Sequence, residues 1–359
     1  MLTILESFKK KGHKILVLLP SNGPITHEFK RLDIDYKVVN FFSSYLYLKI
    51  LYKHLLVPVL FFYNFLALPK LLKATKDFNP DVIYSNTSAE NIGVIISKIL
   101  KIKHVSHIRE FMSLDHGSYF WLGKKNKQKF INMSDGVIFV SEAVASHVLL
   151  GKAKDDDKHQ VIFNGINNKQ ELLPPKKLPV IIKFGLVGVL QASKGHSLAI
   201  DYFNEYVKIN PNAQLHIFGE GYPSYEKMLK KKIKNYALED KIILHGFVKN
   251  TDEIYESIDI LLMFSRSEGF GRVTAEAMFK GVPVIGLNQG GTTELIRNGQ
   301  TGFLVTDYAS FENSAKLLVS SDESYNTIRN NAFNEAKKLF SVEKYTNSVE
   351  TFILNIINK

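Results

Sequence analysis

The chain has 359 residues, of which 46 are Lys or Arg and 35 are Asp or Glu, and 45% of its residues are hydrophobic. This length predicts two domains, and this composition is typical of a folded globular protein rather than a disordered one. Cysteine is absent, which excludes disulfide frameworks, thiolate metal sites and cysteine nucleophiles. The absence of cysteine also agrees with a reducing compartment, so we expect a cytoplasmic protein.

The excess of basic charge is concentrated near the N-terminus. Residues 1–80 hold twelve basic and five acidic side chains, which favours an anionic partner such as a membrane surface, a nucleic acid or a phosphorylated substrate. A nucleic acid is disfavoured because the sequence has no recognition motif for one. Within this region the stretch LLVPVLFFYNFLALP (55–69) is apolar and aromatic. It is shorter than the roughly 20 residues that cross a bilayer, so it predicts either a buried helix or a helix lying on a membrane surface.

The first half of the chain alternates short apolar runs with helix-length segments. The opening residues predict a helix that ends at Gly12 and a buried parallel strand at 14–19. Further strands are predicted at 36–41, 81–86, 104–109, 136–141 and 160–166. This alternation is typical of a doubly wound α/β domain.

A proline-containing segment separates the two halves of the chain. Residues 167–179 carry three prolines and show no periodicity, as is usual for a linker. Near the end of the chain, the apolar residues between 342 and 357 follow the spacing of one helical face. Strands are predicted at 181–188, 214–219, 242–247, 258–264 and 282–287, with helices between them. We therefore predict two Rossmann-like α/β domains, residues 1–170 and 171–340, with a last helix at 341–359 that packs back on the first domain.

Three glycine-rich turns in the second domain each follow a predicted strand. The first to consider is EGFGRVTAEAM (268–278), which leads directly into a helix. Gly269 and Gly271 would let backbone N–H groups at the helix start approach an anion such as a phosphate. The carboxylates of Glu268 and Glu276 suit neutral hydroxyls, which a nucleotide sugar supplies. A surface glutamate and a helix glutamate around an ordinary turn are the structural alternative.

The other two turns have the same arrangement. GLVGVLQASKG (185–195) follows the first strand of the second domain, with Gly188 in the turn and Lys194 just before a helix. A lysine at this place suits a phosphate, although exposed loop lysines are common. NQGGTTELI (288–296) is again a glycine turn before a helix. Because the carboxyl ends of the strands in an open α/β sheet meet at one edge, the three turns predict a single ligand site.

These motifs resemble those of a known enzyme family. VGVLQASKG, LHIFGEG, ILHGFV, SRSEGFGRVTAEAMFKGVPVI and GGTTELIRNGQTGFLV, in this order, are similar to the C-terminal domain of the retaining GT-B glycosyltransferases of family four. The resemblance covers residues 181–305 nearly continuously. HIREFMSLDHG (107–117) resembles a branch that builds bacterial surface and capsular polysaccharides. The resemblance implies the GT-B fold, in which two Rossmann-like domains face a cleft.

The resemblance also implies roles for individual residues. Lys194 would hold the donor diphosphate, Glu276 the ribose hydroxyls and Glu268 the hydroxyls of the transferred sugar. His107 would face the donor sugar, with a structural histidine as the alternative. The implied catalytic residues are His107 and Glu268, and the implied donor-binding residues are Gly188, Lys194, Glu268, Gly269, Phe270, Gly271 and Glu276.

The reaction that the resemblance implies is the transfer of a hexose, with retention, from a nucleotide diphosphate sugar to a hydroxyl of a lipid-linked or other glycan. A UDP-sugar is favoured over a GDP-sugar as the donor, and neither a metal nor a further cofactor is implied. The alternative is an impaired relative that only binds the nucleotide sugar. An ordinary Rossmann oxidoreductase is disfavoured because no G-x-G-x-x-G follows a strand.

Two departures from the family pattern bear on activity. Val189 stands where many members carry an arginine that pairs with the diphosphate, and Arg266 and Arg272 are the candidate replacements. The opening sequence LTILESFKKKGHKILVLLP resembles the helix that follows the family's first strand. We therefore expect that the first domain lacks this strand and that the chain as written is unstable or poorly active, because the first strand of a doubly wound sheet is central.

Overall fold

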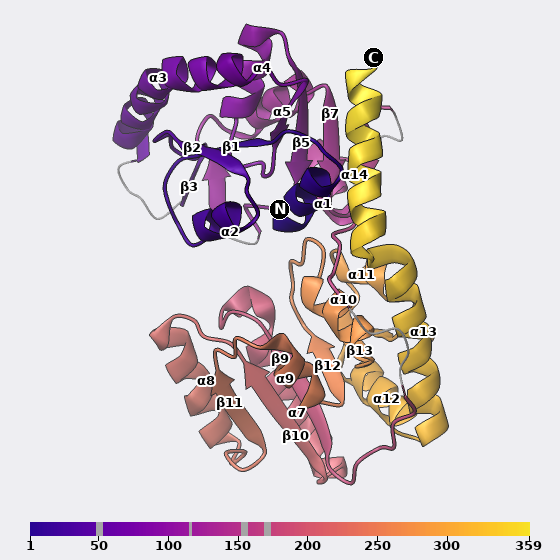
Figure 1. Ribbon diagram of the computed structural model, residues 1–359. Coiled ribbons are helices and arrows are strands. Elements are labelled where there is room, and N and C mark those ends of the chain that lie inside the picture. Colours follow the sequence, from indigo (N-terminus) through magenta and orange to yellow (C-terminus); the bar gives the residue numbers. More distant parts are fainter. Residues whose placement is uncertain (48–52, 115–116, 152–156, 169–173) are drawn as a thin grey trace. The chain divides into compact units, whose positions relative to one another are not determined.

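The computed structural model describes residues 1–47, 53–114, 117–151, 157–168 and 174–359. The chain divides into two compact units, drawn as ribbons in Figure 1. Unit 1 contains Met1–Gly165 together with Val342–Lys359, and unit 2 contains Ile166–Ser341. Both units are built from parallel strands and helices, which confirms the predicted class of two Rossmann-like α/β domains.

The parallel strands of unit 1 fall into two sheets. The smaller sheet pairs β1 (Leu16–Leu19) with β2 (Asp35–Val38). The larger sheet has the order β4-β5-β7-β8, with bounds Val82–Ser85, Lys103–Ile108, Gly136–Phe139 and His159–Val161. A separate antiparallel pair joins β3 (Tyr45–Tyr47) and β6 (Ser118–Phe120). Among the described strands of these two sheets, β1 pairs only with β2 and β4 pairs only with β5.

Helices cover both faces of the strands in unit 1. Leu71 and Ile96, from two helices, pack with Leu18 of β1 and Ile83 of β4, so the two parallel sheets share one apolar layer. On the opposite face Phe352 packs against β5 and β7, and Figure 1 shows its helix, from the C-terminal end of the chain, beside these strands. The helices of unit 1 are α1 (Leu2–Lys10), α2 (Ile25–Arg31), α3 (Lys53–Phe78), α4 (Ile92–Leu100), α5 (Lys124–Met133), α6 (Glu142–Leu149) and α14 (Val342–Ile357).

Helix α3 differs from what the sequence predicts. It continues through Pro58 and Pro69 for 26 residues, whereas prolines normally mark helix ends. The prediction that this element is too short to span a bilayer was therefore wrong, because Leu56–Phe78 is long and apolar enough by length and composition alone. The alternative of a buried helix is also wrong, since only 11% of its most apolar part is buried. The helix instead presents apolar side chains to solvent, while Leu71 anchors its second half in the core of unit 1.

Unit 2 contains one continuous parallel sheet of six strands, in the order β11-β10-β9-β12-β13-β14. Successive strands extend from β9 (Ile182–Val187) in one direction and from β12 (Ile260–Met263) in the other. The other strands are β10 (Ala213–Phe218), β11 (Ile242–Gly246), β13 (Val284–Leu287) and β14 (Phe303–Val305), of which the three-residue β14 was not predicted. The order of the strands reverses between β9 and β12, and ligands of open α/β sheets bind at such a switch point.

The core of unit 2 is aromatic and fully buried. Phe184 of β9 contacts Phe203, Tyr206 and Phe311 at ring-centroid distances of 6.3, 5.3 and 6.1 Å. The helices around the sheet are α7 (His196–Ile209), α8 (Pro223–Asn235), α9 (Thr251–Glu256), α10 (Arg272–Phe279), α11 (Thr292–Leu295), α12 (Tyr308–Leu318) and α13 (Asp322–Phe340). This packing fixes the carboxyl ends of β9 and β12, where the candidate site lies.

Candidate functional site

The loops after β9 and β12 approach each other at main-chain distance. The N–H of Arg266 donates to the carbonyl of Ser193 at 2.8 Å. Gly195 ends the short 3₁₀ turn of the first loop at a φ of +78°, and a Cβ on it would lie 1.9 Å from the carbonyl oxygen of Phe264. Only glycine allows this close approach. The sequence pattern SKG thus joins two loops that are more than sixty positions apart.

Lys194 and Glu268 meet where these loops join. The Lys194 ammonium lies 2.8 Å from Oε2 of Glu268, and their side chains are 29% and 17% exposed. The N–H of Gly271, the residue just before α10, donates to the other carboxylate oxygen at 3.3 Å. The structure therefore brings together the predicted phosphate-binding lysine and the predicted sugar-binding carboxylate, in a partly buried ion pair at the start of a helix.

The glycine turn at 288–296 packs against the glycine turn at 268–278. The N–H of Gly291 donates to the carbonyl of Glu268 at 2.8 Å, and a Cβ on Gly291 would lie 2.4 Å from the carbonyl oxygen of Gly269. All three predicted turns are thus in main-chain contact. The Phe270 ring is buried against Phe340 at a centroid distance of 5.6 Å, so only its main chain faces the loops.

Glu276 lies about one turn into α10, and two neighbouring side chains hold it in place. The Tyr255 hydroxyl donates to Oε2 at 2.9 Å, and Nε of Arg272 donates to Oε1 at 2.8 Å. Burial raises the pKa of Tyr255 well above its usual value, so the phenol stays protonated and keeps its donor role. Sequence reasoning missed Tyr255 because it lies 21 positions from Glu276, in a different helix, and no motif links the two.

The candidate replacements for a diphosphate-binding arginine differ in availability. Val189 itself is 55% exposed and carries no charge. The Arg272 guanidinium is already paired with Glu276, although its side chain is 75% exposed. The Arg266 side chain is exposed, and its main-chain N–H bonds Ser193, the residue before Lys194. Gly188 has a φ of +150°, and a Cβ on Gly219 would lie 1.9 Å from its carbonyl oxygen, so close backbone packing shapes the turn at this end as well.

His107, on β5 of unit 1, is fully buried. Its Nδ1 contacts the Tyr84 hydroxyl and accepts from the Arg109 guanidinium at 3.4 Å, so the ring proton belongs on Nε2. Burial, with the nearby charge of Arg109, holds the pKa of His107 well below its usual value. Nε2 has no hydrogen-bond partner in the described part of the chain. The ring is thus a neutral donor, and a contact with a sugar would require it to become accessible.

Both halves of the chain match family models of glycosyltransferases. Residues 1–170 match the model described as Glycosyltransferase Family 4, and residues 166–335 match the model described as Glycosyl transferases group 1.

Within the parts of the chain that the structure describes, no group of three or more His, Asp or Glu side chains is arranged to hold a metal ion.

Individual relatives agree with these matches. The N-acetyl-alpha-D-glucosaminyl L-malate synthase of Bacillus anthracis is 32% identical over 148 residues, which are 41% of this chain and 38% of that protein. The capsular polysaccharide biosynthesis glycosyltransferase CapM of Staphylococcus aureus is 25% identical over 220 residues, 57% of either protein. The chain thus spans less than two thirds of the length of these relatives. The crystal structure of Anabaena HepE in complex with UDP has a TM-score of 0.78 at 21% identity and covers 98% of this chain and 94% of its own.

Proposed function

The chain belongs to the GT-B glycosyltransferases of family 4, and on this basis we propose that it is a retaining hexosyltransferase that uses a nucleotide diphosphate sugar and no metal. A UDP-sugar is the favoured donor, and the acceptor is a hydroxyl of a lipid-linked glycan in surface polysaccharide biosynthesis. The observation that carries the proposal is the Lys194–Glu268 ion pair at the switch point, directly before α10.

The ion pair suits the two ends of such a donor. A diphosphate beside the start of α10 would attract the Lys194 ammonium and the free N–H groups of the helix. The Glu268 carboxylate, released from the lysine, would then accept hydrogen bonds from hydroxyls of the transferred sugar. Glu276, held by Tyr255 and Arg272, has the rigidity that selective binding of ribose hydroxyls needs. Two carboxylates are useful at a phosphate site only if their partners are neutral hydroxyls.

In the proposed reaction the bond between the sugar C1 and the donor phosphate breaks, and the bond to the acceptor hydroxyl forms on the same face of the ring. The departing phosphate takes the proton of the acceptor, so no protein base is required. Lys194 stabilises the charge that develops on the phosphate, which is the kind of electrostatic contribution that lowers a barrier most. His107 is proposed only as a neutral donor toward the sugar, as its Nε2 proton allows.

The acceptor is proposed to be lipid-linked because of helix α3. Phe61, Phe62, Phe65 and Leu66 are each more than half exposed, and the surrounding N-terminal region is basic. Aromatic side chains beside lysines favour binding at the surface of an anionic membrane. The second half of α3 is packed in unit 1, so we propose peripheral attachment at the cytoplasmic membrane rather than a crossing of the bilayer.

A binding test of the donor site would use purified protein with UDP and GDP. We expect Lys194→Ala and Glu276→Gln to weaken nucleotide binding about tenfold to a hundredfold, because each removes a charged hydrogen-bond partner. Glu268→Gln should lower turnover more than nucleotide affinity. Lys208→Ala, which alters an exposed lysine on α7, is the matched control and should change neither. Unchanged affinities in all variants would contradict the site.

A second candidate is a relative that binds the nucleotide sugar without transferring it. Val189, in place of the expected arginine, favours this candidate, since a diphosphate would meet one cation fewer. Donor hydrolysis, or transfer of labelled sugar to membrane lipids, would exclude it. UDP binding without either reaction would support it.

A further inference from the structure

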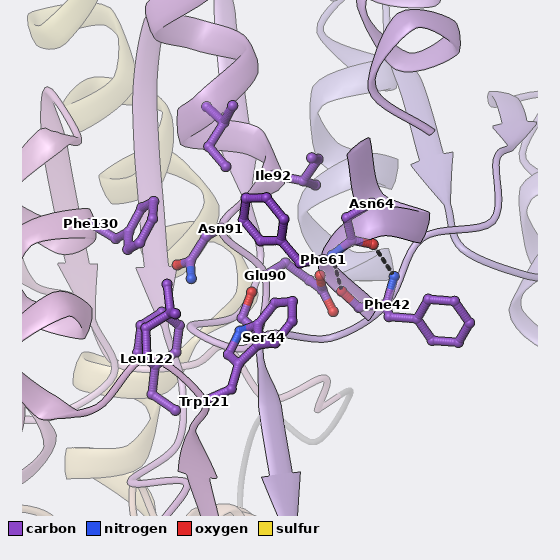
Figure 2. A pocket seen from close by; sticks show the side chains of 12 residues that line it. Phe42, Ser44, Phe61, Asn64, Glu90, Asn91, Ile92, Trp121, Leu122 and Phe130 are labelled. Carbon is purple, nitrogen blue, oxygen red and sulfur yellow. Dashed lines mark hydrogen bonds between the residues drawn. The ribbon is translucent and has the colours of Figure 1, made fainter. Parts of the chain in front are cut away.

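Unit 1 carries a second candidate site, far in sequence from the donor loops. Figure 2 shows a pocket lined mainly by apolar side chains, among them the aromatic rings of Phe61 of α3, Trp121 after β6 and Phe130 of α5. The Phe61 and Trp121 rings contact each other with a centroid distance of 6.5 Å. Glu90 and Asn91 also line this pocket, in the segment between β4 and α4, at the carboxyl end of a parallel strand.

Two polar atoms of this pocket lack a hydrogen-bond partner in the described part of the chain. They are Oε2 of Glu90 and Nε1 of Trp121, and both are buried. A third polar side chain, Asn64, is already used, because it bonds both the N–H and the carbonyl of Phe42. Buried polar atoms are rarely left without partners. One unpaired acceptor and one unpaired donor in an aromatic pocket therefore point to a ligand that supplies both.

The chemistry of the lining selects among ligand classes. A lipid chain would leave the Glu90 carboxyl and the indole N–H without partners, at a cost for each buried group. A phosphate would be repelled by the carboxylate. Burial raises the pKa of Glu90 to about 7, so near neutral pH this carboxyl can accept from a hydroxyl or donate to one. A sugar ring offers hydroxyls at its edge and apolar C–H groups on its faces, which suit aromatic side chains.

We propose that this pocket binds a sugar ring of the acceptor glycan, with Glu90 and Trp121 holding its hydroxyls and the Phe61 ring against its apolar face. This inference rests on the proposed glycosyltransferase function and names a subsite for its acceptor. Its place agrees with a lipid-linked acceptor. Phe61 belongs both to the pocket and to the exposed aromatic surface of α3, so a sugar in the pocket would lie beside the bilayer that holds its lipid.

Trp121 is the single tryptophan of the chain, so its intrinsic fluorescence reports on this pocket alone. The experiment titrates the whole protein with methyl glycosides of glucose, galactose and N-acetylglucosamine, and separately with farnesol as a lipid-chain probe. We expect a saturable change in emission with at least one glycoside. No response to any glycoside, or a response to farnesol only, would overturn the proposal.

Variants separate binding in the pocket from a general effect. Glu90→Leu should weaken glycoside binding about tenfold to a hundredfold, because it removes the carboxyl that would bond the sugar hydroxyls and leaves them without a partner. Glu90→Gln keeps the size of the side chain and should weaken binding less, which guards against a misfolded leucine variant. Ile99→Ser, an exposed position on α4 outside the pocket, is the control and should bind as the unmodified protein does. Equal binding by all three variants would overturn the proposal.

Binding of UDP to unit 2, measured by calorimetry, distinguishes this inference from the proposed function. If UDP binds and no glycoside does, the acceptor subsite is wrong and the proposed function stands. If neither binds, the result counts against both.

Discussion

Unit 1 and unit 2 are built from the same alternation of strand and helix, but their parallel strands are joined differently. In unit 2 the six strands form one sheet, and most residues of β9 and β12 are buried. In unit 1 the strands are divided between β1–β2 and β4-β5-β7-β8, and Val17 is the only buried residue of β1. Both units have helices on both faces of their strands. The difference therefore lies in backbone pairing and not in the presence of an apolar core.

The comparison explains why the two units present their sites so differently. A continuous sheet holds its switch point rigidly. The main-chain atoms of the glycine turns of unit 2 can therefore pack in close contact and still place Lys194 beside Glu268. In unit 1 the candidate pocket depends on side chains from α3, α5 and the segment after β6. This pocket therefore depends on how separate helices and loops pack and not on the edge of one sheet.

The largest effect that we expect is a difference in hydrogen exchange between strands. Amides of β9 should exchange only through global opening, which typically costs 5–15 kcal/mol, whereas β1, paired on one edge, should open locally. The expected difference in protection is about a hundredfold or more. Exchange followed by mass spectrometry on peptides covering 16–19 and 182–187 would measure it.

Strand β7 is the internal control for this experiment. It lies in unit 1 but is paired on both edges, to β5 and β8, and its residues are buried. It should be protected like β9 if pairing decides the outcome. Equal protection of β1 and β7 would show that the division of the sheet has no energetic consequence.

The second prediction concerns the tight packing of the donor loops. Gly195→Ala would force a side chain at positive φ into the carbonyl of Phe264. Strain and overpacking together should lower the free energy of unfolding of unit 2 by about 2–5 kcal/mol. Denaturant titration measures the change, and UDP binding should be lost with it.

The matched control for Gly195 is Gly299, which also lies in unit 2. Its φ is +73°, and a Cβ on it would have no atom within 4 Å. Gly299→Ala should therefore show only the backbone strain, about 1–2 kcal/mol. If both variants lose the same stability, the close approach of the two loops is not what fixes the donor site.

The sequence predicts unit 2 better than unit 1 for physical reasons. The strands and glycine turns of unit 2 have local signals, because a buried strand is a continuous apolar run and a helix start after glycine is a short motif. The contact of Lys194 with Glu268 could be anticipated because strand ends meet at one edge. Tyr255 could not, since its contact with Glu276 depends on how α9 and α10 pack.

In unit 1 the sequence pattern misled at α3 and did not indicate the pocket. Pro58 and Pro69 are local helix-ending signals, but tertiary packing of Leu71 and Ala74 keeps the second half of the helix ordered beyond them. Glu90 and Trp121 belong to segments 31 positions apart that carry no motif. Their meeting depends on the antiparallel β3–β6 pair, which was not predicted because its strands have three residues each.

The third prediction concerns attachment to membranes, which should belong to unit 1 alone. Phe62 and Phe65 are 57% and 62% exposed on α3. Phe62→Ser with Phe65→Ser should reduce partitioning onto anionic vesicles about tenfold or more, because burying one such side chain contributes roughly 1.5–3 kcal/mol. Vesicle sedimentation at low salt measures the change, and added salt should weaken binding of the unmodified protein.

Phe247 of unit 2 is the control for the membrane experiment, since it is 68% exposed and lies outside α3. Phe247→Ser should leave vesicle binding unchanged. If the unmodified protein ignores anionic vesicles at low salt, or if Phe247→Ser has the same effect as the α3 variant, the assignment of the membrane surface to α3 is wrong.

The smallest effect concerns the pH dependence of unit 1. Burial raises the pKa of Glu90 from 4.5 to about 7 in the folded protein. Below pH 4.5 the carboxyl is protonated in both states and contributes no difference. Between these pKa values the unfolded chain releases the proton that the folded chain keeps, so the stability of unit 1 should fall as pH rises through this window and then level off above pH 7. Part of the side chain faces the open pocket, so we expect a change of about 1 kcal/mol or less.

Unfolding followed by Trp121 fluorescence at several pH values would measure it, with each variant compared with the unmodified protein. Glu90→Gln should remove this part of the slope, whereas Asp81→Asn, an exposed carboxyl in the same unit, should leave it as it is. If Glu90→Gln keeps the full slope, the Glu90 carboxyl is ionised and solvated in the folded protein, and the pocket loses the neutral acid that its affinity for a sugar hydroxyl draws on.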